Sequence, residues 1–130
     1  HIDDMTRFAD ENTIITAVES NSQDANFHIL KENLQQIKSW KTEKGNYYNV
    51  VQLPMPNPLY FKGIRLPASY ANFLITNQAV FIPVFDDPND QVACEILQKC
   101  FPNRQIIAIP CKEIVWGLGT LHCLSQQEPV

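Results

Sequence analysis

The sequence predicts an α/β fold made of two copies of a strand-strand-helix-strand unit. Two β-rich runs joined by turn formers occur twice, and each pair is followed by an amphipathic helical pattern and a further β-rich run. Moving the first copy along the sequence by a constant number of residues aligns Thr13 with Ala79, so the second strands of the two copies align. A repeat that cannot cover its own apolar edge must stack on a neighbour. We therefore expect a single domain over residues 1–130.

The first copy opens with a predicted hairpin. The runs MTRFA and TIITAV lie on either side of turn formers at residues 10–12. Asp24 is a candidate cap for the helix that follows, and Lys44 with Gly45 is expected to end it. YYNVVQL predicts the returning strand. The helix has apolar residues at three- and four-residue spacing, namely Phe27, Leu30, Leu34, Ile37 and Trp40.

A proline-rich segment separates the two copies. Prolines within residues 54–58 prevent both a helix and a regular ladder of hydrogen bonds. We therefore expect residues 54–68 to form a long ordered loop, of the kind that is often functional. Its cations, Lys62 and Arg65, could be solvated charges.

The second copy repeats the order of the first. YANFLIT and AVFIPVF flank a turn at residues 77–78 and predict the second hairpin. Asp87 followed by Pro88 predicts a helix with proline at its first position, and QIIAI predicts the returning strand. The expected buried stripe of this helix is Val92, Ile96, Leu97 and Phe101.

Composition limits the classes of partner. Hydrophobic content of 45% and charged content of 18% are ordinary for a globular protein. A net charge of −4 argues against nucleic acid and would tolerate a cationic substrate. No apolar run approaches the roughly 18 residues that span a bilayer, and no charged-then-apolar leader precedes the first strand. We expect a cytoplasmic protein that binds no membrane.

The four cysteines do not form a disulfide framework, because they are too few and too unevenly spaced. Cys94 and Cys100 fall on the second predicted helix and are expected to be core thiols. No C-x-x-C pair is present, and His122 and Cys123 are adjacent, which is unfavourable for a shared zinc ion. We expect no metal.

Residues 116–129, WGLGTLHCLSQQEP, contain the strongest candidate nucleophile. Gly117 and Gly119 can adopt backbone conformations forbidden to other residues and can let a ligand approach the main chain. Cys123 follows this loop, a context that suits a nucleophile better than a core thiol. His122 is expected to shape the loop rather than transfer protons.

Together with HIDD at residues 1–4 and RLPASYANFLITNQAVFIPVF in the middle of the chain, this segment resembles the agmatine deiminase and bacterial peptidylarginine deiminase family of guanidine-modifying enzymes. The resemblance covers the carboxyl-terminal part of such an enzyme. It implies a partial pentein-type propeller, an α/β fold with roughly two ββαβ units present. Many relatives carry three successive glycines where Gly117, Leu118 and Gly119 stand here.

The resemblance also implies roles for particular residues. Cys123 would form a covalent thiouronium adduct with loss of ammonia, and His1 would protonate the leaving group and then activate water. Asp3, on the same face of an extended segment as His1, would hydrogen-bond the guanidinium. Asp4 is expected at the surface or in a turn. Candidate substrate-binding residues are Asp3, Gly117, Gly119, Tyr70 and Asn72, although Tyr70 could equally pack between strands.

The repeat itself indicates one central site. His1 and Asp3 precede the first hairpin, and Cys123 lies near the start of a third unit. The matching place before the second hairpin is occupied by Ser69 and Tyr70. Equivalent positions in a radial array converge on its axis. The activity that the resemblance implies is hydrolysis of agmatine to N-carbamoylputrescine and ammonia, a step of putrescine biosynthesis, without metal or cofactor.

Two alternatives stay open. A peptidylarginine deiminase would act on a guanidinium that is attached to a polypeptide backbone. A truncated, non-catalytic remnant would fold and associate with further copies through exposed edges. The resemblance also implies further acidic residues upstream, so we expect the 130-residue chain alone to be inactive.

Overall fold

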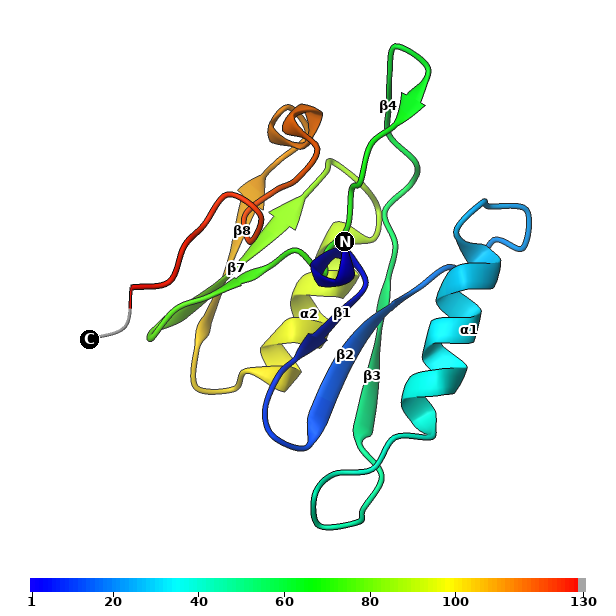
Figure 1. The fold of residues 1–130 in the computed structure, drawn as a ribbon. Coiled ribbons are helices and arrows are strands. Elements are labelled where there is room, and N and C mark those ends of the chain that lie inside the picture. Colours follow the sequence, from blue (N-terminus) through cyan, green and yellow to red (C-terminus); the bar gives the residue numbers. More distant parts are fainter. Residues whose placement is uncertain (129–130) are drawn as a thin grey trace.

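The chain folds into two three-stranded sheets, two α-helices and a small hairpin (Figure 1). The computed structural model describes residues 1–128, so Pro129, which closes the cysteine segment, lies outside the described residues. None of the helices in this described part is long and apolar enough to cross a bilayer.

The first sheet confirms the first predicted unit. Strand β1 (Thr6–Phe8) pairs antiparallel with β2 (Thr13–Val18), and β2 pairs parallel with β3 (Asn49–Pro54). Helix α1 (Phe27–Lys38) connects the two parallel strands and packs on β2. Antiparallel neighbours need only a tight turn, whereas parallel neighbours need a crossover, which the helix supplies here.

Both ends of α1 differ from the prediction. Asn26, not Asp24, is the residue before the first turn, and the Asp24 carboxylate instead accepts the backbone N–H of Asn26 at 2.8 Å. The helix ends at Lys38, well before Gly45, which has φ of 80° in a separate turn. Trp40 therefore lies beyond the helix and is 42% exposed.

The second sheet repeats the first. Strand β6 (Leu74–Ile75) pairs antiparallel with β7 (Ala79–Val84), which pairs parallel with β8 (Gln105–Pro110). Strands β2 and β7 begin at the two residues that the constant shift aligned. Helix α2 (Asp90–Cys100) again makes the crossover.

Helix α2 starts later than predicted. Pro88 is not its first residue: the Asp90 carboxylate accepts backbone N–H groups of Phe85 and Asp87, so this turn forms before the helix. Val92 is 45% exposed, and Ala93 is buried in its place. Ala93 and Leu97 are the fully buried residues of the helix.

Contrary to the prediction, residues 54–68 do not form a continuous loop. Strands β4 (Tyr60–Phe61) and β5 (Ile64–Arg65) form a hairpin that projects from the body of the molecule (Figure 1). Lys62 and Gly63, the turn residues, have φ of 49° and 79°. Positive φ at both positions gives the turn the twist that joins two antiparallel strands.

Arg65 is not a solvated charge. Its guanidinium donates to the Asp24 carboxylate at 2.7 Å, and the two side chains are 22% and 5% exposed. This ion pair fastens the β4–β5 hairpin to the turn before α1. The exposed Lys62 remains a surface charge.

The core lies around α2, which contacts β8 of its own unit and β3 of the first unit. Its members come from both sheets: Ile15 and Leu53 from the first unit pack with Val80, Ile82 and Leu97 of the second. Burial of this shared apolar surface is what joins the two units.

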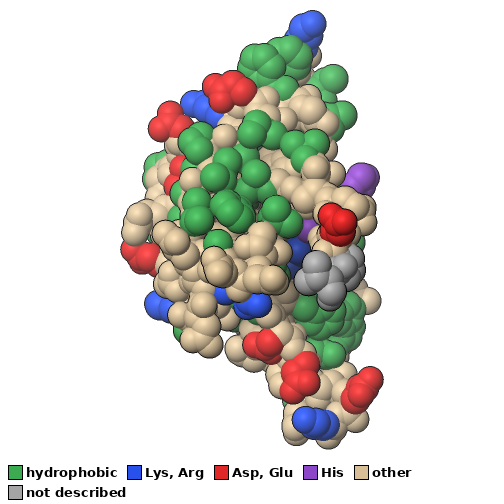
Figure 2. Space-filling view, turned by 90° about the vertical axis from the view of Figure 1, so that its left-hand side faces the viewer, with side chains coloured by type: hydrophobic (Ala, Val, Ile, Leu, Met, Phe, Trp, Pro, Cys, Tyr) green, Lys and Arg blue, Asp and Glu red, His purple; other side chains and the backbone are tan. Residues whose placement is uncertain are grey.

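Exposed aromatic and aliphatic side chains gather at the β4–β5 hairpin, where Phe61 stacks on Trp116 with ring centroids 4.6 Å apart. Figure 2 shows hydrophobic side chains clustered in the upper part of one face.

Candidate active site

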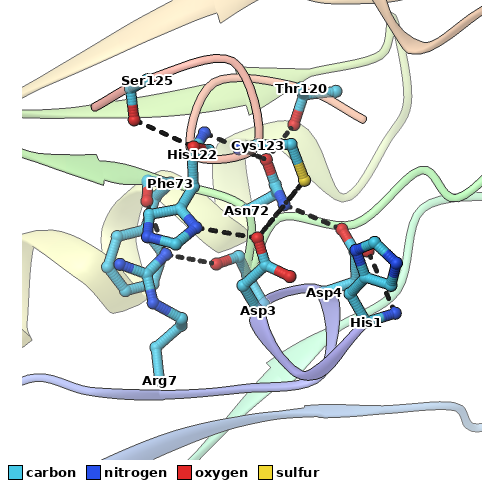
Figure 3. Close-up of polar contacts among 11 residues, drawn as sticks. His1, Asp3, Asp4, Arg7, Asn72, Phe73, Thr120, His122, Cys123 and Ser125 are labelled. Atoms are coloured by element: carbon cyan, nitrogen blue, oxygen red, sulfur yellow. Dashed lines mark hydrogen bonds and ion pairs between the residues drawn. The ribbon is translucent and has the colours of Figure 1, made fainter. Parts of the chain in front are cut away.

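Three segments that are distant in sequence meet beside the Cys123 sulfur (Figure 3). The first is the opening 3-10 helix η1 (Ile2–Asp4), which carries two carboxylates. The second is Asn72, just before β6, and the third is the turn after η2 (Ile114–Gly117), which carries Cys123 itself.

The opening segment is a helical turn rather than the extended segment we expected. A 3-10 helix has three residues per turn, so residues two apart point in different directions. His1 consequently does not share a face with Asp3: its side chain is 88% exposed, and its terminal amine lies 3.7 Å from Asp4. Within residues 1–128 no hydrogen bond joins the His1 imidazole to Cys123.

Asp3 is the carboxylate closest to the thiol. Its Oδ2 accepts from Cys123 Sγ at 3.3 Å and lies 2.7 Å from Nδ1 of His122. Burial opposes ionisation of Asp3, but the hydrogen bonds from His122 and Cys123 outweigh it, so the pKa of this carboxyl is lowered. His122 therefore contacts a charged group of the site, a role that its position beside Cys123 did not reveal.

Asp4 turns inward, contrary to our expectation of a surface or turn residue. Its side chain is 13% exposed, and its Oδ1 accepts from the Asn72 amide at 2.9 Å. Burial, together with the neighbouring charge of Asp3, raises the pKa of Asp4. The HIDD segment thus delivers two adjacent carboxylates with opposite pKa shifts.

Of the two candidates that precede β6, one lies in the site and the other does not. Asn72 is fully buried and contacts Asp3, Asp4 and Cys123. Tyr70 is also fully buried, but its hydroxyl donates to Asp90, the first residue of α2, at 2.7 Å. Burial and the Asp90 hydrogen bond raise the pKa of Tyr70 well above its ordinary value. Tyr70 packs in the core, the alternative that the sequence left open, and its contact with substrate stays a prediction.

The glycine loop uses its residues differently from the prediction. Neither glycine has a positive φ; Leu118 between them adopts the left-handed conformation, with φ of 65°. Gly119 is needed for close approach, because a Cβ there would lie 2.6 Å from the Cys123 Cβ and 3.0 Å from its sulfur. At Gly117 an added Cβ would meet open space.

The Cys123 thiol differs from the other three in its surroundings. Cys94, Cys100 and Cys111 are partly or wholly buried, and burial raises the pKa of each. Cys123 is exposed; burial of its sulfur and the charges of Asp3 and Asp4 raise its pKa, while the Asn72 hydrogen bond lowers it. The balance is a raised pKa, which favours the protonated thiol.

Two carboxylates beside a thiol can bind a small cation. Planar cations with several N–H donors pair well with carboxylates, and a thiolate formed next to them would lie within reach of the bound group. Donor atoms of Asp3, Asp4 and Cys123 lie within 4.8 Å of one another, a spacing that one metal ion could also use. Acidic groups often have this spacing without a metal, and we assign none to them.

Comparison with known proteins finds similarity to deiminases in both sequence and structure. Residues 1–129 match the sequence profile of the Porphyromonas-type peptidyl-arginine deiminase family. An agmatine deiminase of Pseudomonas fluorescens is 32% identical over 99% of the chain, which spans 40% of that protein's length. A crystal structure assigned as an arginine deiminase from Porphyromonas gingivalis matches with a TM-score of 0.96 and 40% identity. The match covers 99% of this chain and 38% of that protein chain. The structure of C. jejuni agmatine deiminase matches with a TM-score of 0.85 and 34% identity, and the match covers 95% of this chain and 37% of that one.

Proposed function

Since the chain belongs to the Porphyromonas-type peptidyl-arginine deiminase family, we propose that it supplies part of the active site of a hydrolase that removes ammonia from a guanidinium group. Its two ββαβ units are part of a pentein-type α/β propeller, the fold of its structural neighbours. The observation that carries the proposal is the juxtaposition of the Cys123 sulfur with Asp3 and Asp4.

We infer that the substrate is agmatine. A protein named agmatine deiminase is among the relatives, and the carboxylates beside Cys123 suit a cationic group. The Cys123 sulfur attacks the guanidinium carbon, and the C–N bond breaks as a proton is delivered to the departing ammonia. Water then adds to the thiouronium carbon, the C–S bond breaks, and N-carbamoylputrescine leaves as the thiol is restored.

The charges of the site suggest how the nucleophile forms. Burial and the two carboxylates raise the pKa of the thiol and so favour its protonated form. A guanidinium bound between these carboxylates and the sulfur would offset the carboxylate charges and favour the thiolate. Substrate binding and activation of the nucleophile are then the same event.

His1 is proposed as the acid that protonates the leaving ammonia and as the base for water. Its terminal amine lies 3.7 Å from Asp4, so this residue stands beside the carboxylates of the site. The chain spans 40% of an agmatine deiminase relative, and we propose that further acidic groups come from sequence outside these 130 residues. The isolated chain is therefore expected to release no ammonia above background.

The test is ammonia release from agmatine by the natural protein that contains these residues. We expect turnover that Cys123→Ser reduces by roughly 10⁴-fold or more, as when a catalytic nucleophile is removed. Cys94→Ser, at a half-buried thiol of α2, is the matched control and should keep activity. A haloacetamidine should label Cys123 before the other thiols. Turnover that survives Cys123→Ser would refute the proposal, and activity on peptidyl-arginine but not agmatine would reassign the substrate.

A further inference from the structure

Asn72 contacts both carboxylates and the nucleophile although its side chain is fully buried. It stands two residues before β6, as Asp4 stands two residues before β1. A fully buried side chain cannot take substrate in its present position. Its contacts therefore serve other groups of the site.

The orientation of the Asn72 amide is fixed by its neighbours. Oδ1 accepts from the Thr120 hydroxyl at 2.9 Å and from the backbone N–H groups of His122 at 3.0 Å and Cys123 at 3.3 Å. Backbone N–H groups can only donate, so the atom that faces them must be the oxygen. The NH₂ group must then face the carboxylates and the sulfur.

The NH₂ group of Asn72 connects the three reacting or binding atoms. Nδ2 lies 2.9 Å from Asp4 Oδ1, 3.0 Å from Cys123 Sγ and 3.2 Å from Asp3 Oδ2. Two N–H bonds face three acceptors, so one donor is shared among them. A single buried amide thus fixes the backbone of Cys123 through its oxygen and the sulfur through its nitrogen.

Arg7, on β1 of the first unit, holds the peptide on both sides of Asn72. Its Nη1 donates to the carbonyl oxygen of Ala71 at 3.2 Å and to that of Phe73 at 2.7 Å. The guanidinium also lies over the Phe73 ring, 4.7 Å from the centroid. A strand of one unit therefore sets the backbone from which the amide of the other unit projects.

We propose that Asn72 is a positioning residue that holds the Cys123 sulfur against Asp3 and Asp4 and stabilises the thiolate as it forms. This inference rests on the proposed function, because it assigns Asn72 a role in preparing the nucleophile. The donor acts against the other influences on the sulfur: burial, Asp3 and Asp4 favour the thiol, whereas the Asn72 hydrogen bond favours the thiolate. Among residues 1–128, the other charged or titratable groups around these atoms are Arg7, His122 and the terminal amine of His1, which lies 3.7 Å from Asp4.

The rate of Cys123 alkylation by iodoacetamide, followed against pH by mass spectrometry in the natural protein, tests this role. Asn72→Ala removes the donor, and we expect its profile to shift to higher pH by about one unit, which lowers labelling at neutral pH about tenfold. Asn72→Asp has nearly the same shape but adds a negative charge, and should shift the profile further. Asn33→Asp is the matched control, because Asn33 is a half-buried amide bonded to Thr6 and Thr16, away from the site.

Cys94 and Cys100 report folding in the same measurement, because they become reactive when α2 loses its packing. Unshifted profiles in both Asn72 variants, with these two thiols still protected, would overturn the proposal. If both variants unfold, Thr120→Val replaces them, because it removes only the hydroxyl that donates to Asn72 Oδ1. Its alkylation profile should shift in the same direction by a smaller amount, and an unshifted profile would overturn the proposal. Ammonia release measured in parallel separates the two ideas: a wild-type protein without turnover refutes the proposed function, while the alkylation profile still decides the role of Asn72.

Discussion

The two ββαβ units have the same strand order but differ in how their helices are covered. Helix α2 lies between β8 of its own sheet and β3 of the first, and its residues Ala93 and Leu97 are completely buried. Helix α1 packs on β2, while Ile29 on its other side is 55% exposed. The same unit thus becomes a central element or an outer one, depending on whether a neighbour packs against its helix.

The units also differ in the chemistry that they bring to the site. The segment before the first hairpin supplies two carboxylates, whereas the segment before the second hairpin supplies the buried amide of Asn72. The scaffold determines where these groups point, and the residue type determines what they do. Charged groups come from the first unit, the positioning group from the second, and the nucleophile from the segment that follows.

The largest effect that tests this assignment of roles to the segments is expected at the residue that transfers protons. We expect His1→Ala to lower kcat for ammonia release roughly 100- to 10,000-fold, because it removes an acid-base group. His122→Asn serves as the comparison, since His122 touches Asp3 but belongs to the nucleophile segment. The measurement is kcat against pH for both variants. If His122→Asn loses more activity and one limb of the pH profile, proton transfer belongs to the later segment.

Asp3 and Asp4 allow substrate binding to be separated from thiol ionisation. Asp3→Asn should lower turnover roughly 100- to 1,000-fold, the loss typical of removing one preorganised electrostatic group. The same change should accelerate Cys123 alkylation at neutral pH, because the Asp3 charge raises the pKa of the thiol. Asp4→Asn should change labelling in the same direction with less effect on turnover. Slower labelling of Asp3→Asn would contradict this account of the site's charges.

The difference between the helices predicts a difference in stability. Leu97→Ala on α2 should lower the free energy of unfolding by about 2–5 kcal/mol, since it leaves a cavity in the shared core. Ile29→Ala on the exposed side of α1 should change it by about 0.5 kcal/mol or less. Urea titration measures both. Equal losses would mean that the outer side of α1 is covered in the natural protein.

The ion pair between Arg65 and Asp24 should give a smaller, pH-dependent effect. Arg65→Met leaves a carboxylate that is 5% exposed without its cation, and should cost about 1–3 kcal/mol at neutral pH. The Arg65 hydrogen bond, above all, lowers the pKa of Asp24, so this contribution is complete above the ordinary carboxyl pKa and disappears as the pH falls through the lowered one. Urea titration of both proteins from neutral to acid pH should show the difference shrinking.

The control for that experiment is Lys112→Met. Lys112 pairs with Asp86 at 3.4 Å, but the two side chains are 50% and 88% exposed. Surface pairs of this kind contribute little to stability, so no measurable change is expected. A difference for Arg65→Met that stays constant down to strongly acid pH would show that packing of the side chain, rather than its charge, stabilises the hairpin.

Much of the fold could be predicted because strand and helix patterns are local. The aligned positions Thr13 and Ala79 both begin strands, and the two hairpins and crossovers are present. Helix ends were less predictable, because competing polar contacts decide them: Asp24 pairs with Arg65 instead of capping α1. The β4–β5 hairpin was missed, because its strands are two residues long and leave no periodic signal.

The candidate site was predictable only in part. The glycine-flanked Cys123 and Asp3 are recognisable from residue type and resemblance, and the structure brings them together at 3.3 Å. The inward turn of Asp4, and the buried amide of Asn72 beneath it, depend on a helical turn and on packing between units. No pattern within one segment of sequence specifies such contacts. The adjacent acidic residues of HIDD were the available signal for Asp4.

The hydrogen bond between Asp3 and His122 joins residues 119 positions apart, whereas the strand pairs that define each unit form over much shorter separations. Contacts between distant segments require larger loops to close and tend to form late during folding. Each unit can therefore acquire its sheet and helix before the nucleophile meets its carboxylates. We therefore expect the site to assemble last and to come apart first, so mild denaturant should abolish the distinctive reactivity of Cys123 while the circular dichroism of both units is unchanged.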